Sequence, residues 1–325
     1  MAQNLKILVI AGGLTHEREV SIRSGRRVAN LLRQFGHTVE VCDLNSQLLP
    51  TLAEFEPDLV WPLIHGSVGE DGSVQDMIEL AGYPYVGSSA EACVLASMKP
   101  TAKALVKKAG MATPDWVSLT QSLFRQVGAP AVIAAIVESL DFPLVVKPSN
   151  GGSALGLSKV NSEDELRSAM VDAFAYGDTV MVEAFIPGRE VAVSVVEEDE
   201  GARILPPVEI ATDDGRYDYD ARYNTGRSEF FVPARLSEEE LFHVKQLALA
   251  VHETLGMRDL SRIDMIVDED GQPWFIDANV VPGMTDTSLL PLAAEADSSF
   301  EELLNQIALR AANDDAVTEE DDLED

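Results

Sequence analysis

The stretch NLKILVIAGGLTHEREVSIRSGRRVANLLRQFG, residues 4–36, decides the fold class of the first part of the chain. Its first ten residues form an apolar run that ends in two glycines, which predicts a buried strand and a tight turn. The remainder predicts an amphipathic helix that stops at Gly36. Its apolar side carries Val20, Val28, Leu31, Leu32 and Phe35.

Two more apolar runs, HTVEVCDL at 37–44 and PDLVWPLIHG at 57–66, predict further strands. The order strand, helix, strand, strand indicates a parallel sheet with crossover helices, and therefore an α/β domain over residues 1–90. Sites on such sheets lie beyond the carboxyl ends of the strands. Those ends carry the polar loops AGGLTHERE and HGSVGEDG.

Residues 91–184 predict a compact second module. They contain the helical segments MKPTAKALVKKAG and AVIAAIVESL, the strand FPLVVKP, a glycine-rich loop, a third helix and the strand TVMVEAF. Ser162 and Glu165 predict a capping box at the start of the third helix.

Residues 185–312 predict an α+β module. The strands REVAVSVVEE and ARILPPVEI precede the Tyr-rich segment DDGRYDYDARYNTGRSEFF and the capped helix SEEELFHVKQLALAVHETLG. The run LSRIDMIVDEDGQPWFIDAN then predicts a hairpin that turns on Asp270 and Gly271. Residues 313–325 hold eight acids and are expected to be disordered.

The charge of the chain limits its partners. With 24 basic and 55 acidic residues among 325, the net charge is −31, which repels phosphate, so neither nucleic acid nor an anionic membrane is an expected partner. Cys42 and Cys93 lie in apolar runs without metal-site spacing, which predicts buried free thiols. Neither a leader sequence nor a long apolar run is present, which favours a cytoplasmic protein.

The predicted hairpin brings acidic side chains together. Its pairing places Asp264 opposite Asp277 and Arg262 opposite Asn279, and residues two apart share a face. Two carboxylates about 4 Å apart repel by about 4 kcal/mol at an effective dielectric of about 20, and a divalent cation reverses that repulsion. Oxygen ligands of this kind suit Mg²⁺. The alternative is a solvated outer face, with the acids pointing into water.

The loop SNGGSALGLS, residues 149–158, is a candidate anion site. Its glycines let backbone N–H groups approach an anion, and Ser153 adds a hydroxyl donor. Lys147 at the end of the preceding strand is either snorkelling or directed at a ligand. The loop matches neither GxxxxGK[ST] nor GxSxG, and a plain turn is the alternative.

Glu17 and His65 lie in the two polar loops at the sheet edge. Glu17 and Glu19 are also what the helix dipole favours in a first helical turn. His65 is a candidate general base, or an ordinary turn residue with its hydrogen bonds satisfied.

Taken in order, six motifs resemble those of the D-alanine:D-alanine ligases, a family of ATP-grasp enzymes. They are HEREVSIRSG, HGSVGEDGSVQ, VKPSNGGSALGLS, YDYDARY, SRIDM and DANVVPGMTDTSL. The resemblance covers about residues 5 to 310. It implies a three-domain ATP-grasp architecture and ATP-dependent joining of two D-alanine molecules through a D-alanyl phosphate, for peptidoglycan precursors.

The resemblance also implies roles for individual residues. At the nucleotide, Lys99 and Lys147 would hold the phosphates. Glu183 and the backbone of Ala184 and Ile186 would bind the adenine. Glu190 would bind the ribose. Two Mg²⁺ ions, with Mn²⁺ as a substitute, would be held by Asp264, Asp277 and Asn279. Glu17 would bind the ammonium of the first D-alanine and, with Ser153 and Tyr223, link it to a mobile loop. Arg262 and the Gly283 amide would stabilise the tetrahedral intermediate. Ser288 and the Leu289 amide would take the second carboxylate, and His65 and Glu70 would line the substrate side.

Four positions depart from the family pattern. Asp277 stands where Glu is usual, Arg222 where Lys is usual beside Tyr223, Ala154 replaces a serine, and Met98 replaces an Asp. Tyr223 predicts D-alanine, not D-lactate, at the second site. The departures leave two alternatives, an ATP-grasp ligase for other amino acids and a non-catalytic ligand-binding relative. A homodimer is expected from the family.

Overall fold

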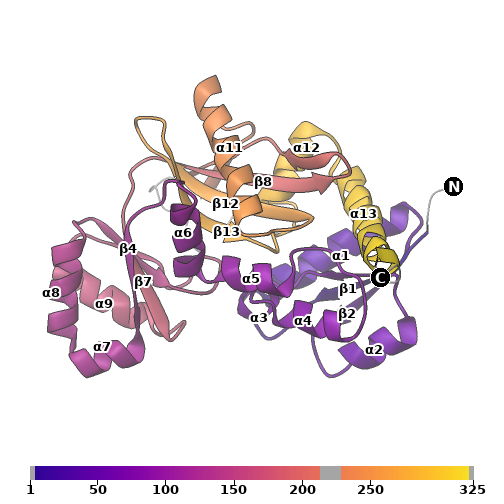
Figure 1. Ribbon diagram of the computed structural model, residues 1–325, viewed down its shortest axis with the longest axis horizontal. Helices are drawn as coiled ribbons and strands as arrows, with labels where there is room; N and C mark the ends of the chain where they lie inside the picture. The colour runs from indigo at the N-terminus through magenta and orange to yellow at the C-terminus, as the bar shows by residue number, and fades with distance from the viewer. Residues whose placement is uncertain (1–3, 213–227, 322–325) are drawn as a thin grey trace.

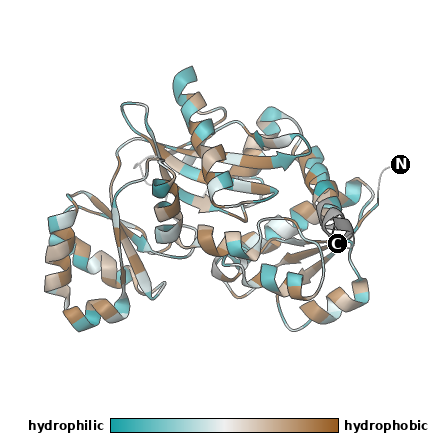
Figure 2. Cartoon of the chain, viewed as in Figure 1, coloured by the Kyte–Doolittle hydropathy of each residue, from teal (hydrophilic) through white to brown (hydrophobic). Residues whose placement is uncertain are grey.

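The structure is a computed structural model that describes residues 4–212 and 228–321, arranged as three modules (Figure 1). Each module has its own sheet, and the three sheets fall within the three predicted ranges. Figure 2 shows apolar residues concentrated along the strands and mixed with polar residues along the helices. None of the helices in these residues is long and apolar enough to cross a membrane.

The N-terminal module is the predicted parallel α/β unit. The sheet order is β2-β1-β3, and both pairings are parallel, so the central strand is buried as its apolar sequence predicts. Its elements are β1 (Lys6–Ala11), α1 (Arg18–Gln34), β2 (Thr38–Asp43), α2 (Leu48–Phe55), β3 (Leu59–Pro62), α3 (Ser67–Glu70) and α4 (Ser73–Leu80). Cys42 is a buried free thiol, as predicted, and so is Cys93.

The central module is a four-stranded antiparallel sheet of order β4-β7-β5-β6 with three helices packed together on it (Figure 1). Its elements are β4 (Trp116–Thr120), α7 (Gln121–Val127), α8 (Ala129–Ser139), β5 (Leu144–Pro148), β6 (Ser158–Val160), α9 (Glu163–Ala173) and β7 (Thr179–Ala184). Ser162 caps α9 by accepting from the Glu165 N–H, as predicted. The Glu165 carboxylate instead accepts from the Asn161 N–H at 2.8 Å, so the return bond of the capping box is shifted by one residue.

The C-terminal module holds the largest sheet, of order β11-β10-β8-β12-β13, with β9 paired to β8. Its elements are β8 (Arg189–Glu198), β9 (Gly201–Ile204), β10 (Val208–Thr212), β11 (Ser228–Phe231), α11 (Glu238–Thr254), β12 (Leu260–Val267), β13 (Pro273–Asn279), α12 (Leu289–Asp297) and α13 (Phe300–Asp321). The run ARILPPVEI forms two strands, not one. Pro206 and Pro207 separate them, because proline has no N–H to give to a sheet.

Two helices predicted to open the central module pack elsewhere. Helices α5 (Ala90–Ser97) and α6 (Lys99–Lys108) contact β13, and Ala96, Ala102 and Val106 join the core that contains Phe275. The core of the central module draws on no residue before Val117 among those described. The boundary expected at residue 91 therefore moves past α6, because the apolar side of this helix is buried against the C-terminal sheet.

The hairpin of β12 and β13 has the predicted pairing at one end and a different turn at the other. Asp264 lies opposite Asp277 and Arg262 opposite Asn279. The chain does not turn on Asp270 and Gly271 alone, since the Asp268 N–H donates to the Gln272 carbonyl and closes a longer loop. A β-bulge between Asp264 and Met265 then shifts the register by one residue. The predicted facing pairs are therefore correct, although the predicted turn is wrong.

The structure also differs from the prediction of disorder at residue 313. Helix α13 runs on to Asp321, and Asn313 donates a side-chain hydrogen bond to the Leu309 carbonyl. The Ala and Glu residues of this segment favour a helix once its first turns are packed on the core. Residues 322–325 lie outside the described residues.

Candidate active site

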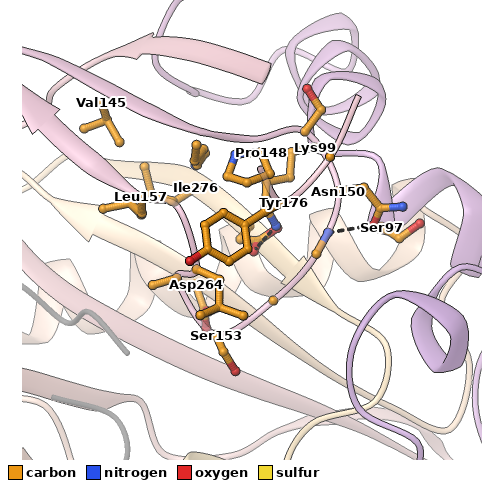
Figure 3. Close-up of a pocket in the computed structure, with 18 of the residues that line it drawn as sticks. Ser97, Lys99, Val145, Pro148, Asn150, Ser153, Leu157, Tyr176, Asp264 and Ile276 are labelled. Atoms are coloured by element: carbon orange, nitrogen blue, oxygen red, sulfur yellow. Dashed lines mark hydrogen bonds and ion pairs between the residues drawn. The ribbon is translucent and has the colours of Figure 1, made fainter. Parts of the chain in front are cut away.

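A cavity of about 850 Å³, here called the large cavity, opens where the three modules meet. Glu17 at the start of α1 contributes one wall, Lys147 at the end of β5 another, and Asp264 on β12 a third. Figure 3 shows Lys99, Ser153 and Asp264 among the residues around it. The ends of the sheets and the glycine-rich loop, residues 149–158, therefore converge on one space.

Glu183 on β7 lies between two lysines at one end of the large cavity. Its Oε1 is 2.6 Å from the Lys147 Nζ, and its Oε2 accepts from the Lys103 Nζ at 2.8 Å. All three side chains are buried. Burial by itself raises the pKa of the Glu183 carboxyl, but the two lysines hold it below its ordinary value. Burial also lowers the pKa of Lys103 to about 8. At neutral pH the group is therefore a carboxylate flanked by two ammonium groups.

The two facing acids of the hairpin each have a cationic partner. The Lys99 Nζ donates to the Asp277 Oδ2 at 2.6 Å. The Arg262 guanidinium donates hydrogen bonds to both Asp264 carboxylate oxygens, at 2.7 and 2.8 Å. Burial raises the pKa of Asp277, and the charges of Lys99 and Lys147 more than reverse that effect. The repulsion expected between the two acids is thus offset by cations.

Asn279 completes the face that the hairpin presents to the cavity. Its side-chain oxygen accepts from the Val281 N–H at 2.9 Å, which orients the amide. Within residues 4–212 and 228–321, no group of three or more His, Cys, Asp and Glu side chains could hold a metal. The candidate metal ligands are therefore two carboxylates and one amide oxygen, a set that suits Mg²⁺ when phosphate oxygens and water complete the coordination.

The glycine-rich loop reaches across to the N-terminal module. Ser153 donates a short hydrogen bond to the Glu17 carboxylate, and both side chains are buried. Ser153 and Ala154 have φ values of 52° and 54°, in the left-handed region that non-glycine residues seldom adopt. A Cβ on Gly152 would lie 3.1 Å from a Glu17 oxygen, so a glycine permits this close approach.

A second space of about 80 Å³, here called the small cavity, adjoins the first. The two share Glu17, Ser153, Arg262 and Asn279. The small cavity adds Gly283 from the loop before α12, and Ser288 and Leu289 from the start of that helix. A Cβ on Gly283 would stand 2.7 Å from the Ser288 Oγ, so the Gly283 backbone is exposed to this space because it carries no side chain.

His65 is buried and neutral, and both of its ring nitrogens are hydrogen-bonded. Its Nδ1 donates to the Val281 carbonyl at 3.1 Å, and its Nε2 accepts from the Ser24 hydroxyl at 2.9 Å. Burial lowers its pKa to about 4. The Met284 N–H also donates to Ser24, so the pair fixes the loop that carries Gly283. The interpretation of His65 as a residue with its hydrogen bonds satisfied therefore agrees with this geometry.

Glu70 stands beside Glu17 in the same wall. Its carboxylate accepts from the Gly66 N–H at 3.1 Å. Burial, and then the charge of Glu17, raise the pKa of Glu70 to about 7. The wall between the cavities thus carries two acids, of which Glu70 is half protonated near neutral pH.

Comparison with known proteins gives one consistent result. A family model described as D-ala D-ala ligase C-terminus matches residues 105–308, and a second, D-ala D-ala ligase N-terminus, matches residues 47–88. The D-alanine–D-alanine ligase of Halalkalibacterium halodurans is 39% identical over 302 residues, which are 92% of this chain and 97% of that protein. That of Aquifex aeolicus is 36% identical over 305 residues, 93% and 99% of the two chains. The chain belongs to the D-alanine–D-alanine ligase family.

Solved structures of the family share the whole architecture. The D-alanine–D-alanine ligase of Bacillus anthracis complexed with ATP has a TM-score of 0.80 and 29% identity, and covers 97% of this chain and 99% of its own. The VanG D-Ala:D-Ser ligase of Enterococcus faecalis has a TM-score of 0.78 and 28% identity, with 95% and 100% covered. As a D-alanine–D-alanine ligase family member, the chain is an ATP-dependent ligase with the ATP-grasp fold.

The candidate site contains two residues to which the sequence analysis assigned no role. Lys103 and Ser24 are both fully buried polar groups bonded to predicted site residues. A signal for Lys103 exists, since it follows Lys99 by four residues on the same helical face as Ala102 and Val106. Among the predicted ligase residues, Ala184, Ile186 and Glu190 line the large cavity with Glu183. Arg222 and Tyr223 lie outside the described residues.

Proposed function

We propose that the chain joins two D-alanine molecules to D-alanyl-D-alanine, at the expense of ATP, for peptidoglycan precursors. The observation that carries the proposal is the meeting of the large and small cavities at Arg262 and Asn279. A nucleotide in the first and amino acids in the second would bring a phosphoryl group and a carboxylate together at that wall.

The large cavity suits a nucleoside triphosphate. Lys99 and Lys147 supply positive charge for phosphates, and the glycine-rich loop offers backbone N–H groups beside them. The base would lie against Glu183 and the backbone of Ala184 and Ile186, with the ribose near Glu190, all of which line the same cavity. Lys99 and Lys147 now bind carboxylates, so nucleotide binding would exchange those partners for phosphate oxygens.

Magnesium fits the donor set of the hairpin. Asp264, Asp277 and Asn279 would hold the ions, and Mn²⁺ accepts the same oxygen ligands. When bound, the metal neutralises charge on the phosphates during phosphoryl transfer. Each acid already has a cationic neighbour, so Lys99 and Arg262 would be released toward the substrate when the metal takes over their carboxylates.

The small cavity suits the two amino acids. Glu17 would bind the ammonium of the first D-alanine, whose carboxylate oxygen attacks the γ-phosphorus to give D-alanyl phosphate and ADP. The amine of the second D-alanine would then form the C–N bond as phosphate leaves. Arg262 and the Gly283 N–H would stabilise the oxyanion of that step. Ser288 and the Leu289 N–H, at the positive end of α12, would hold the second carboxylate.

A single assay separates this proposal from its alternatives. The protein is incubated with ATP, Mg²⁺ and D-alanine, released phosphate is measured, and the product is identified by mass. D-alanyl-D-alanine is the expected product, whereas a mixed dipeptide formed preferentially with D-serine or another amino acid present would indicate a different acceptor. No phosphate release with any amino acid would indicate a non-catalytic relative. Dimerisation stays a prediction, which light scattering on the eluting protein tests.

A further inference from the structure

Lys103 is a buried charge that the proposed chemistry does not use. Its side chain is fully buried, and it does not line the large cavity, although Glu183 and Lys147 do. It reaches Glu183 from α6, and its Nζ lies 5.2 Å from the centre of the Trp116 ring on β4. Trp116 is directly paired with Glu183 across β4 and β7. Lys103 therefore stands behind Glu183 and not beside a ligand.

Lys147 has two competing partners once a nucleotide binds. In this structure it is 2.6 Å from the Glu183 Oε1, and a phosphate would draw it away. Glu183, buried on β7 between β4 and β5, would then have Lys103 as its remaining ammonium partner among the described residues. Asp277 on β13 acts on Lys103 from further away. A buried carboxylate without a cation takes up a proton instead.

The protonation state of Glu183 decides which purine it can bind. A carboxylate only accepts hydrogen bonds, so it suits the 6-amino group of adenine. A carboxylic acid has an O–H donor, which suits the 6-oxo group of hypoxanthine or guanine. Keeping Glu183 ionised is thus equivalent to selecting a 6-aminopurine.

We propose that Lys103 is a positioning and specificity residue, which holds Glu183 as an oriented carboxylate and thereby makes the site select adenine over 6-oxopurine nucleotides. The inference rests on the proposed placement of the base at Glu183. The inference depends on how the two Glu183 oxygens are paired. One lies beside Lys147, which a phosphate could also bind. The other lies beside Lys103, which is fully buried and away from the large cavity.

The test compares the dissociation constants of ATP and ITP, with Mg²⁺ and without D-alanine, by calorimetry on the full chain at pH 6.0 and 7.5. The two nucleotides differ only at the 6-position and the N1 proton. Lys103→Gln is expected to lower the preference for ATP over ITP by about tenfold at pH 6.0, with recovery toward the wild-type ratio at pH 7.5 as Glu183 ionises. Lys103→Arg, which keeps the charge, is expected to retain most of the preference.

Lys107→Gln is the matched control. Lys107 lies one turn further along α6, and its Nζ is 5.7 Å from the same Trp116 ring, but its side chain is half exposed and pairs with Asp115. Its variant should bind both nucleotides as the wild type does. A thermal unfolding curve for each variant verifies that the protein titrated is folded, and the ratio of two constants is insensitive to a small inactive fraction.

Glu183→Gln separates failure of this inference from failure of the proposed function. Its amide can donate to a 6-oxo group, so the ATP preference should fall at both pH values. If it falls there but not in Lys103→Gln, Lys103 has no such role and the base site stands. A Lys103→Gln loss that is equal at both pH values would reflect altered packing and would also overturn the inference. An unchanged ratio in Glu183→Gln would overturn both the inference and the placement of the base.

Discussion

At the scale of single residues, Asp277 distinguishes this chain from the family pattern. Its carboxylate accepts from the Lys99 Nζ at 2.6 Å, and the Lys99 backbone N–H donates to the carbonyl of Ser149, the first residue of the glycine-rich loop. Although Asp277 is shorter than the usual Glu, its carboxylate is therefore within hydrogen-bonding distance of Lys99. The β-bulge fixes the position of Asp277 on β13, and so would fix how far its carboxylate reaches toward the proposed Mg²⁺.

Asp277→Glu tests this reach. The added methylene lets the carboxylate extend further into the large cavity, so the Mg²⁺ concentration for half-maximal ligation is expected to fall by about 3- to 10-fold, on the order of 1 kcal/mol. The measurement is phosphate release against Mg²⁺ at saturating ATP and D-alanine. Asp264→Glu is the control, since Arg262 grips Asp264 bidentately and a longer side chain disturbs that pair, which should raise the Mg²⁺ requirement. An unchanged requirement in Asp277→Glu would contradict the argument.

Glu70 gives a second prediction, about stability. The pKa of the Glu70 carboxyl is about 7 in the folded protein against an ordinary value of 4.5, so the folded state binds its proton more tightly. The free energy of unfolding therefore loses this contribution as pH rises from about 4.5 through 7. Glu70→Gln keeps an acceptor for the Gly66 N–H and removes the titration. It is expected to be more stable than the wild type at pH 8, by at most about 3 kcal/mol, with the difference vanishing toward pH 5.

Thermal unfolding between pH 5 and 8 measures that difference. Glu19→Gln is the control, because Glu19 lies exposed in the first turn of α1 close to the same wall. Its effect should not grow as the pH is raised. A stability difference for Glu70→Gln that stays constant over this range would refute the assignment of the raised pKa.

At the scale of elements, the partly buried Arg310 ties α13 to the sheet. The Arg310 Nη1 is 2.7 Å from the Asp259 Oδ1, and its Nη2 is 3.0 Å from the Glu197 Oε2. Asp259 is 1% exposed and also accepts from the Gly87 N–H at 2.6 Å. One guanidinium thus joins α13, β8 and the start of β12, and Asp259 extends the link to the segment that leaves the N-terminal module.

Arg310→Met is expected to lower the free energy of unfolding by about 3 kcal/mol, because it removes the nearer cation of the buried Asp259 and leaves only Arg258, whose Nε is 3.6 Å from the other oxygen. Lys107→Met removes a lysine from a half-exposed pair with Asp115 and should cost at most about 1 kcal/mol. Urea denaturation followed by tryptophan fluorescence compares the two. Equal losses would mean that the buried network contributes no more than a surface pair.

Element types were predictable from periodicity, while contacts between distant segments were not. The strand and helix over residues 4–36 follow from local spacing. The facing of Asp264 and Asp277 was predicted through a turn that is wrong, and a bulge that no local pattern announces restored it. The bonds of Lys103 to Glu183 and of His65 to Ser24 join residues 80 and 41 positions apart, so only the assembled fold reveals them.

At the scale of the whole molecule, the net charge of −31 acts on every module at once. Like charges repel one another in the folded protein more than in the expanded unfolded chain, and salt screens that repulsion over a Debye length of about 10 Å at 0.1 M. The unfolding temperature is therefore expected to rise by several degrees, about 3–8 °C, between 0.05 and 1 M NaCl.

Choline chloride and sucrose serve as comparisons for that measurement. Choline chloride at the same ionic strength should reproduce most of the rise, because screening depends on ionic strength more than on the identity of the cation. Sucrose separates screening from a general exclusion effect. The same unfolding temperature in low and molar salt would argue against a charge-limited stability, and with it against adaptation to high salt as the reason for the acidic surface.

The bond between Ser153 and Glu17 has a consequence for the order of events. In the proposed function, the ammonium group of the amino acid and the Ser153 hydroxyl would compete for the Glu17 carboxylate, so binding of the amino acid and release of the glycine-rich loop would be thermodynamically coupled. Coupling of this kind is reciprocal. A nucleotide that draws the loop toward its phosphates would raise the affinity of Glu17 for the amino acid. The amino acid would raise the affinity for the nucleotide by the same factor. If Glu17 is the ammonium site, synergy between the two substrates is therefore expected from one shared carboxylate.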